Sequence, residues 1–287
     1  MTRRIFVWMM GAIPSVLRPE QTAGPSDDNR DWVCPMDPDY RSANPGKCPK
    51  CGMTLVLGIP DRIEFHMKVG HTPRVLKPGH EATLDLRFFD PRTHQPATRF
   101  EIVHEKLIHF FLVSESLEFF AHVHPERTSD QTFRQRLRLP EGGMYRLLAD
   151  FYPAGSVPQM ALSTLYVTGH CKPPHLAASL SPQTAKNLTV TLRVEPEHTL
   201  AGVETKLHMA LNPNENLEQY LGAWGHMLTV SADLIEVIHT HPFLRNPDGS
   251  VQFNLVFPRP GLYRIWTQFQ RKGVVNTVIF TIPVSPL

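Results

Sequence analysis

An internal repeat constrains the fold of this chain more than any other sequence feature. The stretch LIHFFLVSESLEFFAHVHP (residues 107–125) returns 117 positions later as WGHMLTVSADLIEVIHTHP (residues 224–242). The two stretches align without a gap and share seven of nineteen residues. Three of the shared residues are histidines, although the whole chain has only 15 histidines among 287 residues. We therefore expect two copies of one module in which the imidazole side chain itself is needed.

Each copy of the repeat has the pattern of a β-hairpin: an apolar run, a short polar turn and a second apolar run. If the first turn is centred between Glu115 and Ser116, His109 lies directly opposite His122, with Cβ atoms roughly 5 Å apart. His124 is two positions further on and shares the same face, about 6.6 Å along the strand. The second copy repeats this arrangement at the equivalent positions, whereas a longer turn or a bulge would change the register.

Three imidazoles on one face of a rigid hairpin suit a copper or zinc ion. Because only neutral imidazole binds metal, we expect the affinity to fall as the pH drops through roughly 6.5. The alternative is that H-x-H-P finishes a strand and that the histidines are structural. The predicted ligands are His109, His122 and His124 in the first half, and His226, His239 and His241 in the second half.

The chain beyond residue 62 is patterned as short strands separated by Pro, Gly and Asp turns. Twenty-seven prolines disfavour long helices, and the same order of strands occurs in both halves. This pattern predicts an all-β fold with two antiparallel, immunoglobulin-like β-sandwich domains. The expected divisions are a first sandwich at residues 62–169, a linker at 170–185 and a second sandwich at 186–287.

A cysteine-rich segment, residues 31–58, precedes the repeats. Its cysteines, Cys34, Cys48 and Cys51, have the spacing C-x13-C-x2-C, and Met36 and Met53 add thioethers nearby. Sulfur ligands of this kind suit Cu(I), Ag(I) or Zn(II). Because so short a segment cannot bury a core of its own, a bound metal ion is the expected source of its stability.

This segment resembles the small heavy-metal-binding domain found beside copper-transporting ATPases and in periplasmic efflux adaptor subunits. The resemblance rests on the stretches CPM (residues 34–36), PGKCP (45–49) and CGM (51–53). It implies a metal site at the three cysteines and a metal efflux system as a partner. The family usually has His after the first Met, whereas this chain has Asp37, a candidate ligand that suits zinc better than Cu(I). The alternatives are a sequence remnant without metal and a disulfide-bonded knuckle.

The two halves resemble immunoglobulin-like modules of secreted bacterial proteins that carry heavy-metal-binding domains and an H…S…H-x-HP hairpin. The resemblance covers most of residues 62–285 and implies an envelope setting, but it implies no particular reaction.

The first 30 residues have the order of charge and polarity of a leader: Arg3 and Arg4, then an apolar run from Ile5 to Leu17, then a polar linker. This order resembles a secretory signal, and the apolar run is too short to span a bilayer. We therefore expect a periplasmic or secreted protein without a membrane span in the mature chain. The alternative is a cytoplasmic leader. The formal net charge of +2 gives no reason to expect nucleic acid or an anionic membrane as a partner.

Together these features predict an envelope protein that binds heavy metal ions, copper or zinc, and buffers or transfers them. No hydrolase or NTPase motif occurs in the sequence, and we do not expect an enzyme. Two alternatives stay open: a two-domain copper monooxygenase, and an adhesive or structural β-sandwich protein. Met227, next to His226, is the thioether that the monooxygenase hypothesis would need, but strand alternation places it on the opposite face.

Overall fold

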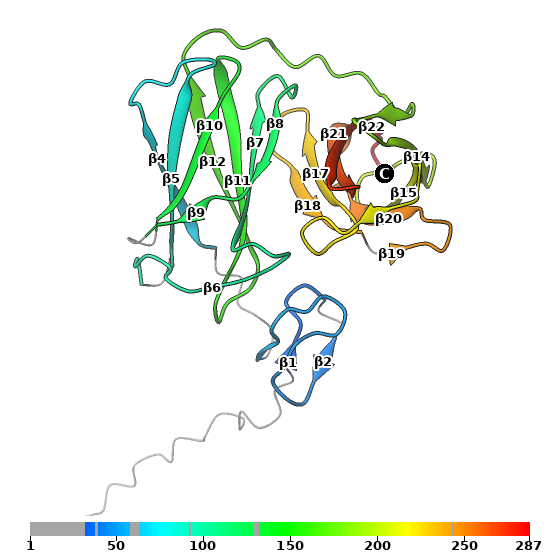
Figure 1. Cartoon of the computed structure of the whole chain (residues 1–287), viewed down its shortest axis with the longest axis horizontal. Helices are drawn as coiled ribbons and strands as arrows, with labels where there is room; N and C mark the ends of the chain where they lie inside the picture. Colours follow the sequence, from blue (N-terminus) through cyan, green and yellow to red (C-terminus); the bar gives the residue numbers. More distant parts are fainter. Residues whose placement is uncertain (1–31, 38–39, 58–63, 92, 129–131, 243) are drawn as a thin grey trace, which may run out of the picture.

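The computed structural model is built from β-strands. It describes residues 32–37, 40–57, 64–91, 93–128, 132–242 and 244–287, and the expected leader, residues 1–30, lies outside these ranges. Two β-sandwiches lie side by side, with the cysteine-rich segment next to them (Figure 1). The described ranges contain no helix that is long and apolar enough to cross a membrane. The prediction of an all-β fold with two antiparallel sandwiches and a cysteine-rich segment is confirmed.

The first sandwich has two antiparallel sheets. Strand β5 shows why they pack: its alternate residues Ala82, Leu84, Leu86 and Phe88 are buried, while the residues between them are more exposed. One sheet has the order β4 (His66–Thr72), β5 (Glu81–Phe89), β10 (Phe133–Arg138), β9 (Glu126–Arg127). The other has the order β12 (Gln159–Val167), β11 (Gly143–Pro153), β7 (Ile108–Ser114), β8 (Phe120–Val123), and β6 (Phe100–Glu101) also pairs with β11.

The second sandwich repeats this plan. One sheet has the order β13 (Gln183–Thr184), β14 (Thr189–Glu195), β15 (Glu204–Asn212), β20 (Val251–Val256), β19 (Leu244–Arg245). The other has the order β16 (Leu217–Glu218), β21 (Gly261–Arg271), β17 (His226–Ser231), β18 (Val237–Thr240), and β22 (Val274–Val284) also pairs with β21. The hairpin β17–β18 is therefore the counterpart of β7–β8, and β21 is the counterpart of β11.

Strands β7 and β17 are buried on both faces along their whole length. On β7, Phe110 and Leu112 face the core of the first sandwich, whereas Phe111 and Val113 belong to a separate core between the two sandwiches. This interdomain core also holds Trp266, whose ring stacks on Phe120 at 5.2 Å between centroids and 9° between planes. Burial of one large apolar side chain contributes roughly 1.5–3 kcal/mol, so the interface is held chiefly by apolar contacts. The full list of its buried residues is Phe111, Val113, Leu117, Leu148, Leu228, Val230, Leu234 and Trp266.

The hairpin register differs from the sequence prediction by two residues. His122 pairs with Phe111, not with His109, and in the second copy His239 pairs with Leu228. The physical reason is a longer turn, in which Leu117 takes a φ of 59° and its N–H donates to the carbonyl of Ser114 at 2.9 Å. A shift of two residues keeps every side chain on its original face, so the predicted shared face of the histidines is retained.

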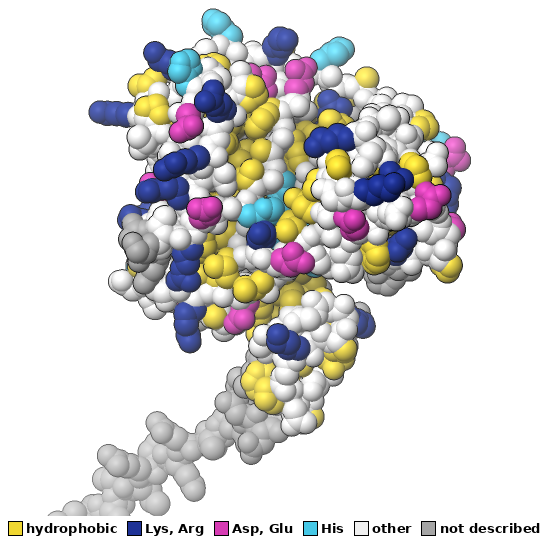
Figure 2. Space-filling model, viewed as in Figure 1, with side chains coloured by type: hydrophobic (Ala, Val, Ile, Leu, Met, Phe, Trp, Pro, Cys, Tyr) yellow, Lys and Arg dark blue, Asp and Glu magenta, His cyan; other side chains and the backbone are white. Residues whose placement is uncertain are grey.

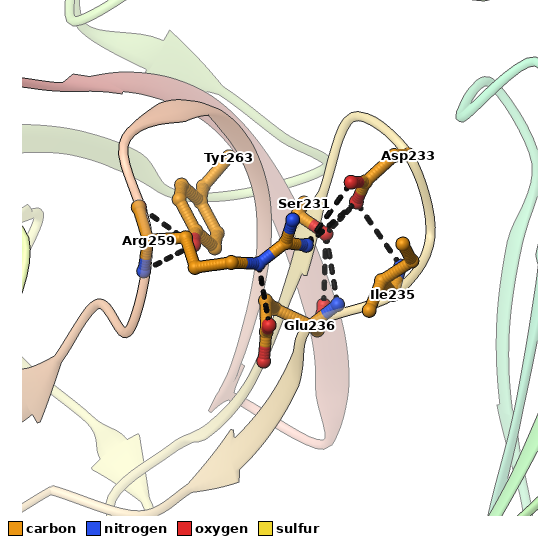
Figure 3. A network of polar contacts seen from close by, with 6 residues as sticks. All are labelled: Ser231, Asp233, Ile235, Glu236, Arg259 and Tyr263. Carbon is orange, nitrogen blue, oxygen red and sulfur yellow. Dashed lines mark hydrogen bonds and ion pairs between the residues drawn. The ribbon is translucent and has the colours of Figure 1, made fainter.

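The turn of the second hairpin is held by a polar network (Figure 3). The Ser231 hydroxyl donates to Asp233 at 2.5 Å, and Asp233 accepts from the backbone N–H of Ile235 at 3.2 Å. Arg259 then reaches across to Asp233 at 3.0 Å and to Glu236 at 2.7 Å. These ion pairs are exposed and contribute little energy each, but they fix the turn that leads into β18.

The cysteine-rich segment forms a sheet of three very short strands. Its core is small: Cys34, Cys48 and Leu55 are buried against partly buried neighbours. It is joined to the first sandwich by a hydrogen bond from the Tyr152 hydroxyl to the carbonyl of Thr54, at 3.2 Å. The sheet order is β2 (Arg41–Ser42), β1 (Trp32–Val33), β3 (Val56–Leu57).

Candidate metal centres

The three cysteines of the N-terminal segment converge, and we call this group the knuckle. Cys34 follows β1, while Cys48 and Cys51 lie on a tight turn closed by the N–H of Gly52, which donates to the carbonyl of Cys48 at 2.8 Å. The sulfur atoms of Cys34, Cys48 and Cys51 all lie within 4.8 Å of one another, and none of the three is in a disulfide. Sulfurs bound to one tetrahedral ion at about 2.3 Å are about 3.8 Å apart, so this donor set fits a thiophilic metal.

The protonation of the knuckle is uneven. Burial opposes ionisation of Cys48, but backbone N–H groups of Cys51 and Lys50 point at its sulfur and lower its pKa. Burial raises the pKa of Cys51 to about 12. At neutral pH this group is therefore not a set of free thiolates, and metal binding must displace protons from it.

The other predicted knuckle ligands take different positions. The carboxylate of Asp37 forms an ion pair with Lys50 at 2.6 Å, and the backbone N–H of Asp37 donates to the sulfur of Cys34 at 3.2 Å. The structure thus directs the Asp37 carboxylate to a cation and not to the sulfurs. Met36 is exposed and Met53 is buried, and both line a small cavity between the knuckle and the sandwiches.

The second predicted triad, His226, His239 and His241, converges as expected, whereas the first is completed by His226 and not by His124. The six predicted histidines meet where the two hairpins face each other, and Figure 2 shows histidine side chains gathered in the crease between the two sandwiches. The ring centroids of His109 and His226, the equivalent residues of the two repeats, are 5.5 Å apart. We call these six residues, three from each half, the histidine cluster. Its two sets of potential ligands are His109, His122 and His226, and His226, His239 and His241; within each set the ligand atoms lie within 4.8 Å of one another.

Hydrogen bonds to backbone carbonyls define which nitrogen is protonated in the two central rings. Nε2 of His109 lies 3.1 Å from the carbonyl oxygen of Val103, and Nε2 of His226 lies 2.9 Å from that of Tyr220. Since a carbonyl can only accept, Nε2 carries the proton in both rings. In the neutral rings Nδ1 is therefore a bare lone pair that faces the cluster.

Two side chains orient histidines of the opposite sandwich. Nδ1 of His122, in the first half, donates to Gln268 of the second half at 2.7 Å. Nδ1 of His239, in the second half, donates to Asp150 of the first half at 2.5 Å. Asp150 pairs with His109 across β7 and β11, and Gln268 pairs with His226 across β17 and β21, so the two contacts are equivalent. Metal-binding histidines usually donate one ring N–H to an acceptor of this kind, which leaves the other nitrogen for the metal.

Two facing ring nitrogens of the first set both lack a proton. Nδ1 of His109 and Nε2 of His122 are 3.0 Å apart, and both rings have already placed their protons on the far nitrogen. Two facing lone pairs repel unless a proton or a cation lies between them. Nitrogens bound to one tetrahedral ion at about 2.0–2.1 Å are about 3.3–3.4 Å apart, so a small outward shift of this pair would admit an ion.

Further buried nitrogens have no partner. Nε2 of His124 and Nε2 of His239 are buried and make no hydrogen bond in the part of the chain that the structure describes. In the second set, Nε2 of His241 lies 3.0 Å from Nδ1 of His226. A buried acceptor without a donor is costly, so these atoms are explained if they bind a cation.

Burial also favours the neutral form of five of these rings. Desolvation, followed by the charges of neighbouring histidines, lowers the pKa of His109 to about 3 and that of His226 to about 2. Burial lowers the pKa of His124 to about 4 and places those of His122 and His241 well below the usual value. Neutral imidazole is the form that binds metal, so the fold prepares these ligands in advance.

Some residues of this region were not predicted as part of a site. His104 stacks beside His241, with ring centroids 3.8 Å apart, but the second repeat has Leu221 at the equivalent position and the repeat gave no signal. Asp150 and Gln268 occupy equivalent positions in the strands that flank the hairpins, but they differ in residue type and the repeat gave no signal for them either. Met227 packs in the core of the second sandwich, on the face opposite to His226, as alternation predicted.

Comparisons with solved structures return sandwich proteins at low similarity. The Escherichia coli adhesin FdeC is 13% identical over 82% of this chain and 71% of its own, with a TM-score of 0.28. The Yersinia pseudotuberculosis adhesin InvE is 11% identical over 77% of this chain and 61% of its own, with a TM-score of 0.24. A two-domain fibronectin type III segment of chicken tenascin is 11% identical over 75% of this chain and 97% of its own, with a TM-score of 0.23. Scores this low carry no argument about function.

Comparisons with family models are more informative. No curated protein matches the sequence. A model described as a heavy metal binding domain matches residues 32–56, which contain the whole knuckle. A second model, described as a domain of unknown function (DUF8832), matches residues 61–168 and again residues 183–286, which together make up more than half of the chain. The chain therefore belongs to the DUF8832 family, of which it carries two copies after a heavy-metal-binding segment.

Proposed function

We propose that this protein binds copper ions at two neighbouring centres, the knuckle and the histidine cluster, and that it buffers copper or transfers it to a metal efflux system. The observation that carries the proposal is the convergence of Cys34, Cys48 and Cys51 within 4.8 Å, inside the segment that matches a heavy metal binding domain. The neutral, oriented imidazoles of the histidine cluster supply the second donor set.

The donor types favour copper over zinc. The knuckle brings three sulfurs together, while its nearest carboxylate, that of Asp37, is paired with Lys50. Thioethers of Met36 and Met53 line the adjacent cavity. Thiolates suit both Cu(I) and zinc, but structural zinc sites are almost always completed by a fourth protein ligand such as His, Cys or a carboxylate, whereas the converging group here has three sulfurs.

The position of the knuckle supports transfer as well as storage. One cavity is lined by Met36 and Met53 of the knuckle segment and by His104, His109 and His241 of the sandwiches. The cavity therefore presents thioethers and imidazoles to the same small space. Both are ligands for copper, which is the arrangement that transfer between the two centres would need.

The proposed location is the bacterial envelope, and it rests on the basic and apolar order of residues 1–17. Expression of the full chain and of a variant without residues 1–30, followed by cell fractionation, tests it. We expect the full chain in the periplasmic fraction and the shortened variant in the cytosol. Recovery of both from the cytosol would contradict the proposed location.

Metal analysis of protein purified without a histidine tag tests the binding proposal. We expect copper in the full chain, less copper in a Cys34→Ser, Cys48→Ser, Cys51→Ser variant, and less again when His122→Ala and His124→Ala are added. A thermal melt of each sample separates loss of ligands from loss of the fold. Unchanged metal content in a destabilised histidine variant would show that the histidines are structural.

A further inference from the structure

The two sets of potential ligands in the histidine cluster share one residue, although the second set lies wholly in the second half. Both sets of converging ligand atoms contain His226. The first set takes His109 and His122 from one half and is completed by His226 of the other half. His124, the third ligand expected from the hairpin pattern, does not complete a group of this size in the part of the chain that the structure describes.

His226 can serve only one ion at a time. Its Nε2 donates to the carbonyl of Tyr220 at 2.9 Å, so Nδ1 is its one available lone pair. An ion bound in one set therefore removes the central ligand of the other. Charge also opposes the binding of a second ion. Asp150 contacts the cluster through His239, and two divalent ions would bring four positive charges beside this carboxylate.

We propose that the histidine cluster is one metal site, centred on His226 and shared by the two sandwiches, that holds a single ion, and that Asp150 and Gln268 are its positioning residues. This inference deepens the proposed function in its histidine half and is independent of the knuckle. The first set takes its ligands from both halves, and each half supplies the acceptor that orients a ligand of the other. Ion binding and docking of the two sandwiches are then one coupled event.

The stoichiometry of the isolated cluster tests this proposal. The variant Cys34→Ser, Cys48→Ser, Cys51→Ser removes the knuckle from the count, and Zn(II) serves as a redox-inert probe beside Cu(II). By calorimetric titration we expect one ion per chain. We expect His226→Ala to abolish this binding, and His109→Ala and His239→Ala each to weaken the same single ion. His71→Ala, an exposed histidine on β4, is the matched control and should leave binding unchanged.

Each outcome decides between the hypotheses. Two ions per chain, with one retained in His226→Ala, would overturn the shared site and restore two separate triads, while the proposed function would stand. No ion in the variant without the knuckle cysteines, with its melting temperature unchanged, would overturn the histidine half of the proposed function together with this inference.

The positioning role has its own test. We expect Asp150→Ala and Gln268→Leu each to weaken binding by about 10–100-fold without changing the stoichiometry, because the rings lose the acceptors that hold their Nδ1 protons. Asp150→Asn keeps an acceptor oxygen and should recover part of the loss. Nitrogen NMR of the His239 ring should show the Nδ1–H tautomer in the parent protein and a mixture of tautomers in Asp150→Ala. An unchanged tautomer and unchanged affinity would rule out positioning by Asp150.

Discussion

The knuckle and the histidine cluster are two metal centres of opposite design. All three cysteines of the knuckle lie within 18 residues, on a segment whose own core consists of a few side chains. The ligands of the histidine cluster come from hairpins 117 residues apart, and the apolar interdomain core holds them in place. The knuckle therefore needs an ion to complete its fold, whereas the histidine cluster is assembled by the fold before any ion arrives.

The largest expected effect is on the knuckle. Binding of a structural ion can contribute on the order of 10 kcal/mol to the folding of such a segment. We therefore expect Cys48→Ser, or removal of metal by a chelator, to abolish hydrogen-exchange protection in residues 32–57 while both sandwiches stay protected. Cys171→Ser, at a cysteine outside the knuckle, is the control and should change nothing. Persistent protection of the knuckle without metal would remove the contrast between the two centres.

The next effect concerns the interdomain core. Trp266→Ala removes a buried ring that stacks on Phe120, and such truncations cost about 3–5 kcal/mol. We expect a lower free energy of unfolding in urea and weaker metal binding at the histidine cluster, with unchanged binding at the knuckle. Tyr166→Ala, at an exposed aromatic residue of β12, is the matched control. Equal losses at both centres would show that the knuckle also depends on this interface.

A third prediction uses pH. The pKa of His109 is about 3 and that of His226 about 2 in the folded protein, against about 6.5 in an unfolded chain. Below pH 6.5 the unfolded chain binds more protons, so the metal-free protein loses stability as the pH falls and gains nothing further above pH 6.5. Each such histidine contributes a slope of about 1.4 kcal/mol per pH unit.

Urea unfolding of metal-free protein at pH 7, 6 and 5 measures this slope. In the double variant His109→Ala, His226→Ala the slope should be smaller. The same low pKa values imply that the histidines of the folded cluster stay neutral at a lower pH than free imidazole does. Metal binding should therefore persist below about pH 6.5, the value expected from the ordinary pKa of imidazole. A slope that does not change in the double variant would contradict the assigned pKa shifts.

The smallest expected effect lies far from both centres. Lys272 has a φ of 49° in the turn between β21 and β22, directly before Gly273 at 68°. Asn before Gly suits two consecutive positive φ angles better than Lys does. We expect Lys272→Asn to raise the free energy of unfolding by about 0.5 kcal/mol and to leave metal binding at both centres unchanged. A change in either metal affinity would mean that general stability, and not local geometry, controls binding.

Local features of the sequence were sufficient to predict the knuckle and the strand pattern. The spacing of Cys34, Cys48 and Cys51 identified a group that the structure brings together, because a tight turn needs only neighbouring residues. The repeat likewise indicated which histidines share a face. The exact pairing was wrong, since the αL conformation of Leu117 lengthens the turn and polar turn residues do not reveal it.

Long-range packing could not be predicted in the same way. The apolar run from Phe110 to Val113 is typical of a strand buried on both faces, but it does not say what covers the second face. That face is covered by the other copy of the module, which merges two predicted triads into one cluster. Asp150 and Gln268 escaped prediction for the same reason, because each contacts a histidine only after the two sandwiches dock.

The equivalent contacts across the interface have a consequence for how such a chain can arise. The same surface of each module faces its counterpart, which is the self-complementary geometry of a twofold homodimer. In a true homodimer any substitution appears twice, so the acceptors opposite the histidines would be two carboxylates or two amides. A fused chain escapes this restriction, and here Asp150 and Gln268 occupy the two equivalent positions. Duplication within one polypeptide thus permits a symmetric pocket to carry a single negative charge, a balance that suits one bound cation.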